Sequence, residues 1–345
     1  MSESRRSSIS STWSEDNQTP CARYSLRRAT PFRMLKYAGI FVLGLALVFL
    51  LSTRTSVSSK VLPTRIPAPT SIPASQPASP SSQSFPRIGK VTASFGPGDP
   101  VYEAAIASHQ VHNDLHGYPQ FILRERMLPG LWSKHAFLLT ILGAELAKPA
   151  AERLEWLFWH DRDTILMNPN VPLQVFLPPV QDVHLVVTND RHGLNNGVFF
   201  VRVNEWAIRF FAAALSLKEY NPDIQLKYSE QSAMEEVSMR QYFSSAVAHV
   251  PQRWFNGFPP NPAHPDKPSL ARPASLLIHF ASNRDGKRPE RMAYWAGVAR
   301  SKGDEWIKPL NETGYPAELE EYWARIGKGE DVENLCKEIG ARVWT

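Results

Sequence analysis

The sequence predicts an α/β domain, built on a single mostly parallel sheet, behind an N-terminal transmembrane helix. Three observations lead to this architecture. From residue 88 onward, short apolar runs alternate with longer amphipathic segments, as in sheets that carry helices on both faces. Residues 37–53 form an uncharged and largely apolar run. Residues 52–86 contain 10 Ser, 4 Thr and 7 Pro, a composition that cannot bury a hydrophobic core.

The basic charge of the chain is confined to its N-terminal part. The 345 residues include 38 Lys and Arg and 33 Asp and Glu, which leaves a net charge of +5. Residues 1–90 hold 12 of the basic residues and 3 of the acids, so residues 91–345 have 26 against 30 and a net charge of −4. The folded part therefore lacks the positive excess that is typical of nucleic-acid binding, and no nucleic-acid partner is expected.

The apolar run predicts a membrane anchor. Since about 20 apolar residues cross a bilayer, residues 34–53 are a short transmembrane signal anchor. Basic residues cluster on its N-terminal side, so residues 1–33 are expected to be a cytosolic tail. Residues 54–87 would be a Ser/Pro/Thr-rich stem and residues 88–345 a lumenal domain, in single-pass type II topology. The alternative, a buried core helix, has no neighbouring core to receive it.

This topology has two consequences for covalent chemistry. Asn311-Glu312-Thr313 is an N-glycosylation acceptor on the lumenal side. Cys21 and Cys336 would lie on opposite sides of the membrane, so no disulfide is expected within the domain.

The elements of the lumenal domain follow from its apolar periodicity, with Gly and Pro marking the ends of segments. The predicted strands are Val91–Phe95, Tyr118–Leu123, Leu154–Trp159, Val183–Thr188, Val198–Val201, Ala246–Val250 and Leu276–Phe280. The predicted helices cover residues 101–114, 132–146, 204–217, 229–244, 286–300 and 316–326. Ligands of such sheets bind at the carboxyl ends of the strands, so polar residues that follow a strand are the first functional candidates.

Two aspartates separated by one residue follow a strongly apolar strand. Asp161 and Asp163, with Arg162 between them, come directly after Leu154–Trp159 and His160. Two carboxylates held close at the end of a buried strand are costly unless a cation neutralises them. Oxygen ligands suit Mg²⁺ or Mn²⁺, which in turn bind phosphate oxygens. The alternative is a pair of solvated acids in a β-turn.

A segment rich in Asn and Gly precedes another predicted strand. Gly193 and Gly197 bracket Asn195 and Asn196. Glycine lets the backbone approach a ligand closely, and amide side chains offer the donors and acceptors that sugar hydroxyls need. The alternative is an ordinary Asn/Gly turn.

Two later clusters complete the candidates. Glu230 and Gln231 open a predicted helix after Ser229, whose simplest role is an N-cap. His279 ends an apolar strand, and cations including Arg284 and Lys287 follow it. A histidine in this position can complete a metal site whose other ligands are carboxylates, while the cations can hold a diphosphate. The alternative is an unligated core or surface histidine.

In their order along the chain, these clusters resemble glycosyltransferase family 34, the fungal galactosyl- and mannosyltransferases related to plant xyloglucan xylosyltransferases. The resemblance spans roughly residues 91–300, and the anchor with its stem is the usual membrane layout of the family. The matching stretches are His112-Asn113 with His116-Gly117-Tyr118, Trp132-Ser133-Lys134, Asp161-Arg162-Asp163 with Met167-Asn168-Pro169, Gly193–Gly197 with Glu205-Trp206, Glu230–Ala233, and Ile278-His279-Phe280.

The resemblance implies a GT-A-like fold with a Rossmann-like sheet, in a Golgi type II enzyme. The enzyme would transfer galactose or mannose from UDP-galactose or GDP-mannose to a glycan acceptor, with Mn²⁺ or Mg²⁺ and with retention to an α linkage. The metal ligands would be Asp161, Asp163 and His279. The donor-binding residues would be Phe95, Asp161, Arg162, Asn195, Lys134, Arg284 and Lys287. The catalytic residues would be Glu230, Gln231 and Asn196.

Two departures from the family pattern leave a rival open. Arg162 replaces the usual small residue inside the D-x-D motif, and Ser229 stands where the family has an acid. Arg162 could reach the phosphates or fill the donor pocket. The rival is a non-catalytic subunit of a mannan-polymerising complex, in a hetero-oligomer with other Golgi glycosyltransferases. A lumenal lectin-like protein is a third reading. The donor sugar, the acceptor and the linkage position depend on loop shapes, not on these motifs.

Overall fold

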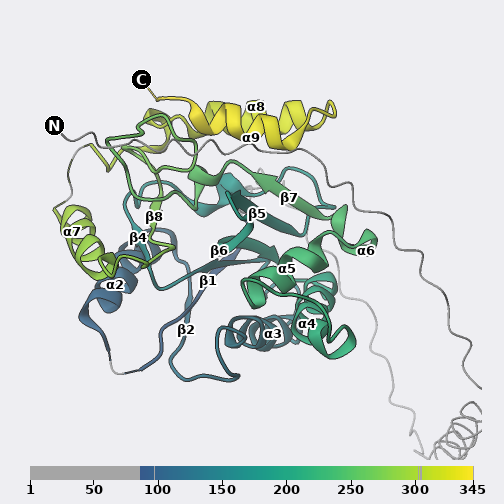
Figure 1. Cartoon of the computed structure of the whole chain (residues 1–345). Coiled ribbons are helices and arrows are strands. Elements are labelled where there is room, and N and C mark those ends of the chain that lie inside the picture. The colour runs from purple at the N-terminus through teal and green to yellow at the C-terminus, as the bar shows by residue number, and fades with distance from the viewer. Residues whose placement is uncertain (1–85, 97, 302, 304, 345) are drawn as a thin grey trace, which may run out of the picture. The chain divides into compact units, whose positions relative to one another are not determined.

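The structure is a computed structural model that describes residues 86–96, 98–301, 303 and 305–344 (Figure 1). The predicted tail, the predicted anchor and the stem up to residue 85 lie outside the described residues. Among the helices of the described ranges, none combines the length and the apolar character needed to cross a bilayer. The account below concerns the compact unit that contains residues 86–344.

A six-stranded, mostly parallel sheet forms the centre of the unit, as the sequence predicts. From one edge to the other its strands are β2 (Gln120–Leu123), β1 (Ile88–Ala93), β3 (Trp156–His160), β6 (Gly193–Arg202), β5 (Leu185–Asp190) and β7 (Val247–Val250). Only β6 runs antiparallel to its neighbours within this sheet. The carboxyl ends of the parallel strands β1, β3 and β5 therefore all lie at the same end of the strands. Because β6 runs the other way, its amino half lies at that end too.

Helices cover both faces of the sheet (Figure 1). On one face, α3 (Ser133–Leu146), α4 (Glu205–Tyr220) and α5 (Glu230–Ser238) pack through Leu138, Phe210 and Met234. On the other face, α8 (Tyr315–Ile326) and α9 (Val332–Ala341) pack together with the 3-10 turn η1 (Leu173–Phe176). All five residues of β3 are buried, and their alternation sends Phe158 into one core and Trp159 into the other.

A second, two-stranded sheet stands beside the first. The strands β4 (Thr164–Leu166) and β8 (Leu277–His279) pair antiparallel. The helices α2 (Pro100–His116) and α7 (Arg288–Arg300) pack against this pair through a third apolar cluster. The prediction of one sheet is wrong here: β4 is only three residues long, too short for a periodic signal, and it takes β8 out of the main sheet.

Several elements differ from their predicted bounds for local reasons. The helix predicted at 229–244 is divided into α5 and α6 (Gln241–Ser244), because Arg240 between them has extended backbone angles. The segment 193–197, expected to be a turn before a strand, is the first half of β6, in which residues 193–195 pair with β5. The helix α9 (Val332–Ala341), which begins after an Asp331 cap, was not predicted. The remaining 3-10 turns are η2 (Gln252–Trp254) and η3 (Leu310–Glu312).

Candidate active site

A cavity of about 710 Å³ opens beyond the carboxyl end of β3. Segments far apart in the sequence contribute to its wall: the turn from β3 to β4, the first half of β6, the start of α5, and the region from β8 into α7. Of the predicted site residues, the cavity is lined by Asp161, Asp163, Asn195, Asn196, Glu230, Gln231, His279 and Arg284. This is the position at which open α/β sheets bind their ligands.

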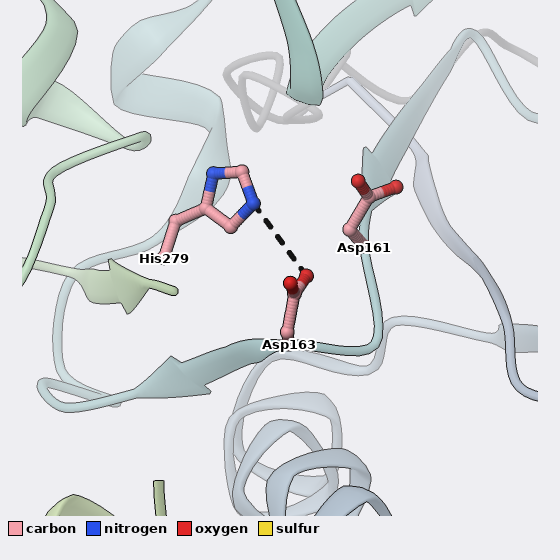
Figure 2. Close-up of side chains that lie close together, drawn as sticks. All are labelled: Asp161, Asp163 and His279. Atoms are coloured by element: carbon pink, nitrogen blue, oxygen red, sulfur yellow. Dashed lines mark ion pairs between the residues drawn. The ribbon is translucent and has the colours of Figure 1, made fainter. Parts of the chain in front are cut away.

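Two carboxylates and one imidazole meet at the base of the cavity. Asp161, Asp163 and His279 each offer one ligand atom, and these atoms lie within 4.8 Å of one another (Figure 2). The pairing of β4 with β8 places Thr164 opposite His279, which brings His279 Nε2 to 3.5 Å from Asp163 Oδ1. Asp161 is held in place by its backbone N–H, which donates to the carbonyl of Gly197 at 2.7 Å.

The hydrogen bonds around His279 fix the orientation of its ring, so that Nε2 faces the candidate metal site. Asn256 Nδ2 donates to Thr188 Oγ1 at 2.8 Å and to Asn195 Oδ1 at 3.0 Å, so Asn256 Oδ1 is left as an acceptor. His279 Nδ1 donates to that oxygen at 2.6 Å. Nδ1 is therefore a donor, and Nε2, which faces Asp163, is the nitrogen available to a cation. This donor set, two carboxylates and one imidazole nitrogen, suits a divalent cation.

Gly197 makes room for the His279 ring. A Cβ at this position would lie 2.1 Å from Cε1 of His279. We expected Gly193 and Gly197 to bring backbone close to a ligand, but the structure shows that Gly197 admits a neighbouring side chain. Gly193 has φ +102°, and a Cβ there would meet Glu235. Both glycines are therefore required by the packing around the cavity.

Asp163 is kept ionised by its neighbours. Burial alone would raise its pKa, but the imidazole of His279 and the guanidinium of Arg288 hold the pKa below its usual range. Arg288 NH1 donates to Asp163 Oδ2 at 2.7 Å. Arg288 also lines the cavity, whereas the cations predicted to be functional are Arg284 and Lys287.

Lys134 contacts Asp161 and two of the predicted catalytic residues, Asn196 and Glu230. Its buried ammonium lies 3.0 Å from Asp161 Oδ1 and 3.7 Å from Glu230 Oε1. The same ammonium donates to the backbone carbonyl of Asn196 at 2.9 Å and to its side-chain oxygen at 3.1 Å. Lys134 was predicted to bind the donor, but among the described residues it stands behind the cavity wall and holds three wall residues in place.

Glu230, the first residue of α5, is almost completely buried. Burial raises the pKa of its carboxyl group, and the ammonium of Lys134 opposes this shift. Its Oε1 accepts from Asn196 Nδ2 at 3.4 Å, whereas its buried Oε2 has no hydrogen-bond partner among the described residues. Ser229 before it has φ 55° and makes no side-chain cap, so its predicted capping role is wrong. Gln231 Oε1 accepts from the backbone N–H of Asn196 at 3.3 Å.

Besides Lys134, three of the predicted donor-binding residues do not line the described cavity: Phe95, Arg162 and Lys287. The guanidinium of Arg162 stacks on the ring of Tyr102, with 3.9 Å from Cζ to the centroid, and donates to the carbonyl of Phe95 at 3.4 Å. The Phe95 ring is covered by the guanidinium of Arg126. Arg162 therefore leaves the donor pocket open, because cation–π stacking directs it toward α2.

Sequence reasoning missed Asn256 as a site residue. It follows η2, has no motif of its own, and is buried where it bonds to both His279 and Asn195. Arg288 was visible as one of several cations after His279, but no sequence signal shows which of them faces Asp163.

Comparison with known proteins gives one family. The sequence model of the galactosyl transferase GMA12/MNN10 family matches residues 176–288, a segment that holds Asn195, Glu230 and His279. A curated relative, the probable alpha-1,2-galactosyltransferase gmh1 of Schizosaccharomyces pombe (strain 972 / ATCC 24843), is 23% identical in an alignment over 190 residues that covers 45% of this chain and 54% of the relative. The chain thus matches about half the length of that relative.

Solved structures with a similar arrangement include two glycosyltransferases. One is involved in glycosylation of the major capsid of PBCV-1; it has 18% identity and a TM-score of 0.48, with 61% of this chain and all of that chain covered. The other is the galactosyltransferase LgtC in complex with donor and acceptor sugar analogues; it has 14% identity and a TM-score of 0.39, with 66% of this chain and 99% of that chain covered.

Proposed function

We propose, from the confirmed resemblance to glycosyltransferase family 34, that this chain is a glycosyltransferase that transfers a hexose from a nucleotide sugar to a glycan acceptor. Galactose is the first candidate sugar, because the matching family model and the curated relative are both galactosyltransferases by name. Mannose is the second. The proposal includes a GT-A-like fold, a divalent cation, retention of configuration, and a Golgi location as a single-pass type II protein.

One observation carries the proposal: the Asp161, Asp163 and His279 cluster shares a cavity with the buried Glu230. Glycosyl transfer expels a nucleoside diphosphate, whose developing charge must be neutralised. A divalent cation held by Asp161, Asp163 and His279 would supply that neutralisation when bound. The oxocarbenium-like sugar also needs an electron-rich group, and Glu230, which lines the same cavity, carries a carboxyl group that could supply it.

The chain's own residues keep this arrangement rigid. The ammonium of Lys134 occupies Asp161 Oδ1, so that Asp161 Oδ2 remains for the cation. Lys134 also favours the ionised form of Glu230 against the effect of burial. Asn196 is fixed from both sides by Lys134 and Gln231, which leaves Glu230 little freedom to turn away.

The rival reading, a non-catalytic subunit, loses part of its support. It rested on Arg162 and on Ser229. Arg162 stacks on Tyr102 and therefore does not fill the cavity. Although Ser229 replaces the acid of the family pattern, the next residue, Glu230, still lies beside Lys134.

A direct test uses the purified full chain with UDP-galactose and with GDP-mannose, each with and without Mn²⁺, and measures both hydrolysis and transfer to glycan acceptors. We expect metal-dependent turnover of one donor, and a loss of at least about a hundredfold in Asp163→Ala because one ligand of the cation is removed. Asp182→Asn, at an exposed position outside the cavity lining, is the matched control. The proposal fails if neither donor is turned over and no nucleotide binds with Mn²⁺.

A further inference from the structure

Arg288 pairs with Asp163, a carboxylate that a bound cation would also need. It is the first residue of α7, and its NH1 donates to Asp163 Oδ2 at 2.7 Å, while His279 Nε2 lies 3.5 Å from the other oxygen of the same carboxylate. Asp163 is 7% exposed, so solvent screens this ion pair poorly. A permanently charged guanidinium therefore already neutralises one of the three candidate metal ligands.

A divalent cation at Asp163 would be repelled by Arg288 unless an anion arrived with it. Two cations that share one buried carboxylate interact unfavourably, and the carboxylate can compensate only one of them fully. A diphosphate brings the missing negative charge. It also brings oxygen acceptors that suit the forked geometry of a guanidinium at least as well as a carboxylate does.

The Arg288 side chain has a hydrogen-bond donor that could bind a diphosphate. Its Nε is buried and has no hydrogen-bond partner among the described residues, and the residue lines the cavity. Its main chain is tied independently, because the backbone N–H donates to Asn283 Oδ1 at 2.8 Å. The guanidinium can therefore change partner while the start of α7 remains in place.

We propose that Arg288 exchanges partners during the binding cycle: it neutralises Asp163 when the site is free and binds the diphosphate when cation and nucleotide enter together. The inference rests on the proposed function, since it takes the ligand to be a nucleoside diphosphate with a divalent cation. Its consequence is positive coupling, in which each ligand raises the affinity for the other, because the pair satisfies Asp163 and Arg288 at once.

Two neighbouring arginines provide contrasts. Arg284 lines the cavity and has no ion-pair partner among the described residues. Arg291 lies on α7 and pairs with Asp285 at 2.5 Å. Either could attract a diphosphate by charge, but neither makes an ion pair with Asp163. Their loss should weaken nucleotide binding without improving the binding of the cation alone.

The test is calorimetry on the full chain with three titrations: Mn²⁺ alone, UDP alone, and Mn²⁺ in the presence of saturating UDP, with GDP as a second nucleotide. For the wild type we expect UDP to raise Mn²⁺ affinity at least about tenfold, the scale of one charge-assisted hydrogen bond. In Arg288→Ala, Mn²⁺ alone should bind as tightly as in the wild type or more tightly, UDP with Mn²⁺ should bind about tenfold more weakly, and the coupling should fall by at least the same factor. Arg284→Ala and Arg291→Ala should keep the coupling.

Several outcomes are decisive. If Arg288→Ala weakens Mn²⁺ and UDP by the same factor and leaves the coupling intact, Arg288 is only a structural clamp and the inference is overturned. Arg288→Lys, which keeps the charge and loses the fork, should retain part of the coupling. Thermal unfolding of each variant, with Arg288→Gln as a less disruptive change, shows whether the fold is preserved. If the wild type binds neither nucleotide with Mn²⁺, the proposed function itself fails. If the wild type binds Mn²⁺ and a nucleotide without coupling, only the inference about Arg288 is overturned.

Discussion

Replacement of Gly197 by alanine should disable the candidate metal site through one methyl group. The new Cβ would lie 2.1 Å from Cε1, 2.8 Å from Nε2 and 2.9 Å from Nδ1 of His279. Since carbon atoms in contact lie about 3.5 Å apart, the ring would have to retreat by about 1.4 Å. The backbone of Gly197 cannot yield easily, because its carbonyl accepts the N–H of Asp161 at 2.7 Å and its own N–H donates to Asn195 Oδ1 at 2.9 Å.

That retreat would break the bond from His279 Nδ1 to Asn256 and move Nε2 out of the ligand cluster. Displacement of a metal ligand or its hydrogen-bond partner typically reduces metal affinity about tenfold to a hundredfold. Overpacking of this kind costs about 1–3 kcal/mol of folding free energy. We therefore expect Gly197→Ala to remain folded with a lowered melting temperature and to bind Mn²⁺ at least about tenfold more weakly.

The assay is Mn²⁺ calorimetry with a parallel thermal unfolding curve. Gly143→Ala is the matched control, because this exposed glycine of α3 has no atom within 4 Å of the added Cβ. Alanine there should raise stability by up to about 1 kcal/mol and leave Mn²⁺ binding unchanged. A folded Gly197→Ala protein with wild-type Mn²⁺ affinity would refute the reasoning, since His279 would then not be a ligand held against Gly197.

Two further predictions concern stability. Burial lowers the pKa of several histidines, among them His109, His112 and His135, and that of His135 falls to about 3. Below about pH 6.5 these histidines bind protons in the unfolded chain but not in the folded one. The free energy of unfolding should therefore be highest above that pH and should fall as the pH is lowered toward 3, by up to about 1.4 kcal/mol per pH unit for each histidine. Urea unfolding at pH 7.5, 6 and 5 measures this, and His135→Phe should reduce the slope; equal stability at all three values would contradict the assignment. Separately, Glu318→Gln should cost about 3–5 kcal/mol, since it leaves the fully buried guanidinium of Arg253 without its counter-charge. Glu338→Gln, in an exposed ion pair, should cost far less in the same thermal unfolding measurement, and similar losses in both variants would show that burial does not decide the cost.

Local patterns were sufficient for most of the elements. The alternation of apolar and polar residues predicts β3, α3 and α4 within two or three residues, because each presents a long apolar face to a core. The strand β4 escaped prediction because it is three residues long and is stabilised by its partner β8, not by its own composition. The division between α5 and α6 also has no periodic signal, since a single extended residue, Arg240, makes it.

The sequence by itself determined which chemistry the site offers: paired carboxylates after a buried strand, amide side chains, a strand-end histidine and nearby cations. These are properties of residue type and of position relative to a strand, and both can be read along the chain. Tertiary structure decided which of these groups meet. Asp163 and His279 come together only through the pairing of β4 with β8, Arg162 turns away because Tyr102 lies beside it, and Arg288 reaches Asp163 because α7 begins there. Contacts between residues that lie 60 or more positions apart depend on packing, which leaves no periodic trace in the sequence.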